Sequence, residues 1–136
     1  MTIDLDKYPK VPALNRISPL QNNNELAAAI NKLCEMAYSN SYAHGFYDLE
    51  EGEQVNLGEK IALMHSELSE VLEVMRKDPT KESEKIPGFL QIEEEFADTI
   101  IRIADTCGAR GWNLGGAIIA KHTYNVERPY KHGKKF

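Results

Sequence analysis

The fold of this chain is decided by residues 56–77, which read NLGEKIALMHSELSEVLEVMRK. Apolar residues recur there every three or four positions, the spacing that places side chains on one face of an α-helix. Asp78-Pro79 ends the pattern, because a residue that precedes proline disfavours the helical conformation. The pattern predicts an amphipathic helix whose apolar stripe consists of Ile61, Met64, Leu68, Val71, Leu72 and Met75.

A second such stretch begins at Phe89 or Gln91 and runs to Cys107, before Gly108 and Gly111. It has two apolar faces with a polar stripe between them. A helix that is apolar on two sides is expected to lie between other helices, so its polar stripe is expected to line an internal cleft. One apolar face contains Ile92, Phe96, Ile100 and Ile103, the other Ala97, Ile101 and Ala104, and the polar stripe Glu95, Asp98, Arg102 and Asp105.

Two further helices are predicted at about residues 24–43 and 114–127. Asn113 can cap the last one, because an asparagine side chain accepts hydrogen bonds from free helical N–H groups. Gly115 and Gly116 would let another backbone approach its first turn closely. No stretch shows sustained alternation or a hairpin turn. We therefore predict an all-α fold, a helical bundle of about four main helices.

The length of 136 residues suits one domain. Residues 1–22 contain Pro9, Pro12 and Pro19 and are expected to form an arm, with the domain proper at 23–136. The formal net charge of −5 disfavours nucleic acid as a partner. No apolar run is long enough to span a membrane, and the first residues do not resemble a secretory signal. The two cysteines are too few for a disulfide framework, so we expect a cytoplasmic protein with reduced thiols.

Two carboxylate pairs, Glu67 with Glu70 and Glu95 with Asp98, are spaced i, i+3 on consecutive predicted helices. Each pair alone could be a solvated helix face. Antiparallel neighbouring helices would instead bring the pairs face to face, where unpaired carboxylates are costly to bury. A divalent cation would neutralise them. Oxygen ligands without His or Cys favour Mg²⁺, or Mn²⁺, over Zn²⁺. No His follows a Glu by three residues, which disfavours a di-iron site.

Basic and amide side chains recur at Lys121, Asn125 and Arg128, on one face of the last predicted helix. They could donate hydrogen bonds to phosphate oxygens, whereas the alternative is a solvated face followed by a basic tail. Trp112 or Phe46 could stack on a nucleobase, although aromatics of small domains usually belong to the core. An acidic metal cluster facing a basic group would suit a polyphosphate substrate.

These motifs resemble those of the MazG-like, all-α nucleoside triphosphate pyrophosphohydrolases. That family carries Glu-x-x-Glu on one helix and Glu-x-x-Asp on the next, as at residues 67–70 (ELSE) and 95–98 (EFAD) here. Asn125 and residues 128–134 (RPYKHGK) resemble the ending of one MazG-like subgroup. The resemblance covers about residues 24–136 and leaves out the arm.

The resemblance implies Mg²⁺-dependent hydrolysis of a nucleoside triphosphate between the α and β phosphates, to remove unwanted nucleotides. The implied metal ligands and catalytic residues are Glu67, Glu70, Glu95 and Asp98, and the expected substrate-binding residues are Lys121, Asn125, Arg128 and Trp112. It also implies a homodimer or homotetramer, which agrees with the surplus apolar face of the third helix. The preferred base stays open.

The alternative is a non-catalytic helical interaction protein with a solvated acidic face and a basic tail. Such a protein would bind no divalent ion, so its melting temperature would not respond to Mg²⁺.

Overall fold

The computed structural model describes residues 23–129 and Gly133. Within these residues the chain forms four helices and no strand, which confirms the all-α prediction. The arm predicted for residues 1–22 lies outside the described residues, and so does most of the tail after Pro129. No helix of the described part is both long and apolar enough to cross a bilayer. The helices are α1 (Asn23–Ala43), α2 (Leu57–Lys77), α3 (Gln91–Arg110) and α4 (Leu114–Val126).

Asparagine side chains cap two of the helices. Asn56 accepts a hydrogen bond from the backbone N–H of Glu59 at 3.2 Å and starts α2. Asn113 accepts one from the N–H of Gly116 at 2.9 Å, so its predicted role at the start of α4 is confirmed. Both caps satisfy N–H groups that the first helical turn leaves free.

The prediction that α3 ends at Cys107 is wrong. The helix continues to Arg110, and its C-cap is Gly111, whose φ of 65° is the left-handed conformation that glycine adopts easily. Gly108 lies inside the helix, where its small size serves packing instead of termination.

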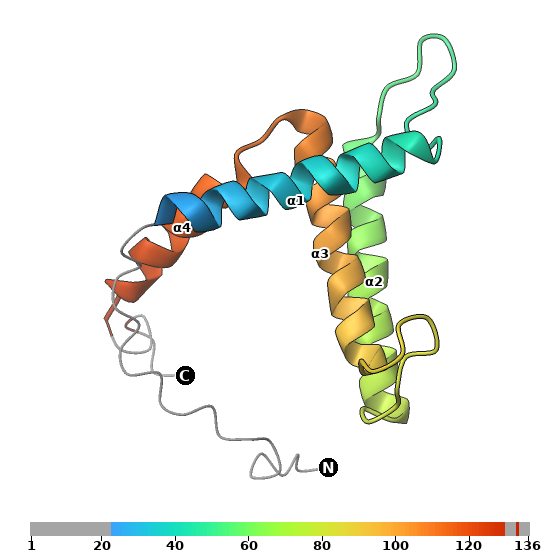
Figure 1. Cartoon of the computed structure of the whole chain (residues 1–136), viewed down its shortest axis with the longest axis vertical. Coiled ribbons are helices and arrows are strands. Elements are labelled where there is room, and N and C mark those ends of the chain that lie inside the picture. Colours follow the sequence, from blue (N-terminus) through green and yellow to red (C-terminus); the bar gives the residue numbers. More distant parts are fainter. Residues whose placement is uncertain (1–22, 130–132, 134–136) are drawn as a thin grey trace.

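The helices form an open arrangement (Figure 1). α2 and α3 lie side by side and antiparallel, and α1 crosses them near one end. α4 packs against the N-terminal part of α1, and among the described residues it makes no comparable packing with α2 or α3. A single chain therefore does not close into a compact four-helix bundle.

Small residues dominate the interior. Cys34 and Ala37 of α1 pack with Ala104 and Cys107 of α3, and both cysteines are free thiols. Many larger apolar residues stay exposed: Leu68, Leu72, Phe96 and Ile100 keep 45%, 50%, 48% and 55% of their surface accessible. Part of one apolar face of α3 and part of the apolar stripe of α2 are thus uncovered by the described residues, while Ile103 of the same α3 face packs on the core.

Backbone-to-backbone contact joins α1 to its two partners. A Cβ atom at Gly108 would lie 2.2 Å from the carbonyl oxygen of Cys34, and one at Gly115 would lie 2.1 Å from that of Ala27. Both distances are far below contact, so each crossing requires glycine. The predicted close approach is confirmed at Gly115, whereas Gly116 is crowded by its own cap residue, Asn113.

Gly108→Ala should therefore destabilise the fold, by about 1–3 kcal/mol as in other overpacked sites. Alanine has a higher helix propensity than glycine, but we expect the steric clash with α1 to outweigh that gain in stability. Urea denaturation measures the loss, with Gly58→Ala as control. A Cβ at Gly58 would meet only a side-chain atom, the Asn56 Oδ1 at 3.2 Å, and no backbone of another helix. Equal stability of the two variants would contradict the close crossing.

Candidate metal centre

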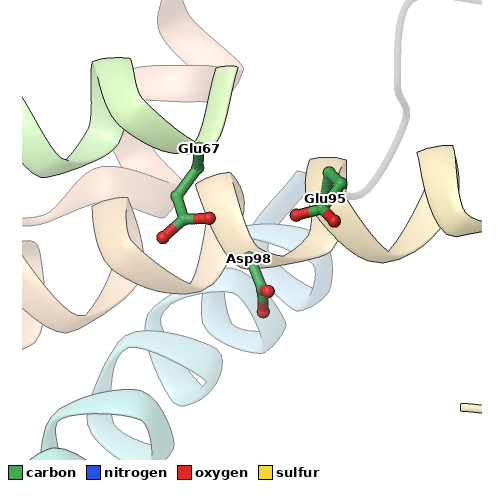
Figure 2. Close-up of side chains that lie close together, drawn as sticks. All are labelled: Glu67, Glu95 and Asp98. Carbon is green, nitrogen blue, oxygen red and sulfur yellow. The ribbon is translucent and has the colours of Figure 1, made fainter. Parts of the chain in front are cut away.

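Three of the four predicted acids converge between α2 and α3. One carboxylate oxygen each of Glu67, Glu95 and Asp98 can be chosen so that all lie within 4.8 Å of one another. Figure 2 shows Glu67 reaching from α2 toward α3, where Glu95 and Asp98 stand one turn apart. Glu67 is 8% and Glu95 3% exposed, while Asp98 is half-buried. The i, i+3 spacing and the antiparallel packing together explain this convergence.

Glu70, the fourth predicted acid, stands apart from this group. Its side chain is exposed, and it is not among the acids whose oxygens converge. It is nevertheless close enough that its charge helps to raise the pKa of Glu95. Glu70 and Glu95 line one small pocket of about 220 Å³ together. Glu70 therefore borders the centre without belonging to its tightest part.

Glu95 is the most constrained of the acids. Burial raises its pKa, and repulsion from Glu70 raises it further. Among the described residues, its Oε2 atom is buried without a hydrogen-bond partner. Buried polar atoms are nearly always paired in folded proteins, because an unpaired one is costly. A carboxylate oxygen of this kind, beside two further carboxylates, fits a ligand position for a hard divalent cation.

The neighbouring Glu94 has a structural role instead. Its Oε2 accepts a hydrogen bond from Ser83 Oγ at 2.5 Å, and Lys85 Nζ lies 2.6 Å from its Oε1. These contacts lower the pKa of Glu94, the bond to Lys85 most of all. They tie the start of α3 to the preceding connection, where Gln91 N donates to Lys81 O at 2.8 Å. The position of Glu95 is fixed by this attachment.

A pocket of about 240 Å³ opens beside the three acids. Two cations, Lys60 and Arg102, stand among its acidic and aromatic side chains. Arg102 Nε donates to Glu67 Oε1 at 2.5 Å. The lining residues are Ser41, Phe46, Lys60, Glu67, Asp98, Ile101, Arg102 and Asp105. The pocket thus brings positive charge next to the candidate ligands.

Lys60 is held by a partly buried network. Its Nζ lies 3.3 Å from Asp105 Oδ2 and 4.4 Å from the ring centre of Tyr47. Tyr47 donates its hydroxyl hydrogen bond to Asp105 Oδ1 at 2.8 Å. Burial raises the pKa of Tyr47, and the bond to the Asp105 carboxylate raises it further. This network connects the α1–α2 loop, α2 and α3 at the pocket.

The sequence-based prediction included Arg102 and Asp105 in the polar stripe but assigned them no role, and it did not identify Lys60. A signal for Lys60 was present, because it precedes Glu67 by two helical turns and shares its face. No local pattern, however, shows that a lysine in an otherwise ordinary amphipathic helix will meet an aspartate of another helix.

The predicted basic group does not join the acids within one chain. Lys121 and Asn125 are exposed on α4, which packs along α1 and away from α2. The Lys121 Nζ and Arg128 Cζ atoms lie 4.6 and 5.9 Å from the ring centre of Tyr124. Trp112 is 51% exposed in the turn before α4 and lines neither pocket beside the acids.

Comparisons with protein-family models, with curated proteins and with solved structures find no match for this chain.

Removing the charge of Glu95 should stabilise the metal-free protein. Its folded-state pKa is raised, so the stability it contributes is complete below its unfolded pKa of about 4.3 and is lost as pH rises through the folded value. Glu95→Gln avoids that loss. In EDTA we expect a gain near pH 7 of about 0.5–2 kcal/mol that shrinks toward pH 4.

Melting curves between pH 4 and 7 measure this gain. Glu35→Gln is the control, because Glu35 pairs with Lys32 at 3.0 Å on the exposed surface of α1 and lines neither pocket beside the acids. A gain from Glu95→Gln that did not change with pH would contradict the proposed crowding of charge.

Proposed function

We propose that this chain is a Mg²⁺-dependent nucleoside triphosphate pyrophosphohydrolase, which cleaves between the α and β phosphates and releases a nucleoside monophosphate and pyrophosphate. The observation that carries the proposal is the convergence of Glu67, Glu95 and Asp98 within 4.8 Å, with an unpaired buried oxygen on Glu95. A pocket containing Lys60 and Arg102 adjoins these acids, as an anionic substrate requires.

The ligand chemistry supports Mg²⁺ as the metal. The three converging side chains offer carboxylate oxygens only. Hard oxygen ligands suit Mg²⁺ and Mn²⁺, whereas Zn²⁺ is usually held with His or Cys. Both cysteines lie in the contact between α1 and α3 and take no part in the cluster. Mn²⁺ is expected to substitute for Mg²⁺.

Each part of the site has a role in this reaction. Bound Mg²⁺ supplies charge neutralisation and Lewis acidity at the phosphates. Glu70, exposed beside the ligands, is available to accept a proton from the attacking water. Lys60 lines the pocket and, while paired with Asp105, contributes positive charge that would attract a phosphate. Phe46, 73% exposed at the same pocket, offers a surface on which a base can stack, and it suits that role better than Trp112 within one chain.

The resemblance to the MazG-like family supports the same assignment, because its two acidic motifs contain these residues. We propose the biological role that the resemblance implies, removal of unwanted nucleoside triphosphates from the nucleotide pool.

Purified protein should release pyrophosphate from a panel of nucleoside triphosphates in Mg²⁺ and lose this activity in EDTA. Glu67→Gln and Asp98→Asn should abolish turnover without unfolding the protein, since both relieve repulsion among clustered acids. Glu73→Gln should leave the rate nearly unchanged, because Glu73 pairs with Lys77 at 2.8 Å and is not among the converging acids, although it lines the small pocket with Glu70 and Glu95.

Pyrophosphate release at the full rate in EDTA would contradict the proposed metal. If no triphosphate is hydrolysed and the melting temperature does not respond to Mg²⁺, the alternative of a non-catalytic interaction protein is favoured instead.

The uncovered apolar faces support assembly into a homodimer or homotetramer. Leu68 and Leu72 of α2 and Phe96 and Ile100 of α3 are each at least 45% exposed. Contiguous exposed apolar surface usually marks a subunit contact. A second copy could also supply Lys121, Asn125 and Arg128, which do not reach the acids of their own chain.

Sedimentation should show a dimer or larger particle at micromolar concentration. Leu72→Glu should shift it toward monomer, because a buried unpaired carboxylate is costly at an apolar contact. Glu73→Gln, next to it on the polar side of α2, should leave the particle size unchanged. A monomeric wild-type protein would contradict the proposed assembly.

Arg128→Ala should lower kcat/KM about ten- to a hundredfold for every base alike, because it would remove a charge-assisted bond to phosphate. If a second copy supplies Arg128, mixed subunits of Arg128→Ala and Glu67→Gln should regain activity that neither variant has alone. A base-selective effect, or none, would leave the tail as a solvated segment.

A further inference from the structure

Arg102 is the cation that directly opposes the acidic centre. Among the ion pairs of residues 23–129, its bond to Glu67 is the only one made by Glu67, Glu95 or Asp98. It stands on α3 one turn after Asp98, at the wall of the pocket described above. Arg102 therefore balances part of the charge that the three acids concentrate.

The other nearby cations are engaged elsewhere. Lys60 is held by Asp105 and Tyr47, and only 20% of its side chain is exposed. Lys85 pairs with Glu94 at 2.6 Å. Both lysines thus pair with acids outside the converging group, whereas Arg102 pairs with one of its members.

Arg102 is far more exposed than the acid with which it pairs. Its side chain is 41% exposed, against 10% for that of Glu67. A guanidinium group has five N–H donors, and Nε is the one that contacts Glu67. Arg102 also lines the pocket of about 240 Å³ beside the acids, where its guanidinium could contact a bound anion. Exposure and spare donors make a second position possible.

We propose that Arg102 is an exchangeable counter-ion: it pairs with Glu67 in the metal-free protein, gives way when a divalent cation binds, and then contacts a phosphate of the substrate in the adjoining pocket. This inference rests on the proposed function. Two cations within a few ångströms repel each other, so Arg102 next to Glu67 opposes metal binding there. A phosphate in the pocket gives the displaced guanidinium a new partner.

A purely supporting role for Arg102 predicts the opposite behaviour. An arginine that merely oriented Glu67 for the metal would strengthen binding, and its loss would weaken metal affinity about 10–100-fold. The sign of the change in metal affinity therefore separates the two roles, and it requires no substrate.

The test is calorimetric titration of the metal-free full chain with Mg²⁺ alone, for wild type and Arg102→Gln. The glutamine removes the charge and keeps a donor for Glu67. We expect Arg102→Gln to bind Mg²⁺ about tenfold more tightly. Arg102→Lys keeps the charge and should bind Mg²⁺ like wild type. Arg110→Gln, which removes an exposed arginine at the end of the same helix, should also bind like wild type.

Thermal melting gives a second readout. In EDTA, Arg102→Gln should melt below wild type, because the acids lose their counter-charge, and saturating Mg²⁺ should close the difference. Turnover of Arg102→Gln should fall despite its tighter metal binding, since the phosphate loses a partner. Unchanged or weaker Mg²⁺ binding by Arg102→Gln overturns this inference alone. Absence of Mg²⁺ binding by the wild type overturns both it and the proposed function.

Discussion

Mutual repulsion among carboxylates governs the centre of this molecule. The packing of α2 against α3 brings Glu67, Glu95 and Asp98 within 4.8 Å of one another and buries two of them. Such an arrangement is unfavourable unless positive charge or protons accompany it. The raised pKa of Glu95 is the direct consequence of this burial and of the neighbouring Glu70. The helix pair is thus built around a charge that it does not fully neutralise by itself.

The surrounding contacts hold that charge in place. Ser83 and Lys85 fix Glu94 and with it the start of α3. At the wall of the larger pocket, Asp105 forms an ion pair with Lys60 and accepts a hydrogen bond from Tyr47. Glu94 and Asp105 are therefore paired with lysines, whereas no ion pair among the described residues involves Glu95, whose Oε2 is buried without a hydrogen-bond partner. This difference in pairing separates Glu95 from Glu94, which the local sequence does not, since the two are neighbours in the chain.

The open shape of the chain connects the site to assembly. The α1 helix reaches α3 and α4 through glycine contacts at Gly108 and Gly115, and it holds α4 away from α2 (Figure 1). Within the described residues, Leu72 and Ile100 stay half-exposed, and the basic residues of α4 contact Tyr124 but do not reach the acids. A second copy would cover the apolar surface and bring basic residues to the acids, and this is why assembly and substrate binding are linked in our proposal.

The sequence by itself determined the all-α class, the starts of α2 and α4, and the shared helix face of Glu95 and Asp98, because helical periodicity, asparagine caps and i, i+3 spacing are local properties. The antiparallel packing of α2 on α3 then brought Glu67 to them, as expected for neighbouring helices. It mistook Gly108 for a helix end, since the need for a close crossing with Cys34 arises only when α1 packs on α3. Tertiary structure alone decided that Glu70 stays exposed, that Lys60 meets Asp105, that Arg102 meets Glu67 and that α4 lies away from the acids. Those outcomes depend on the angles and depths at which helices pack, and such long-range geometry leaves no mark on the spacing of residues along the chain.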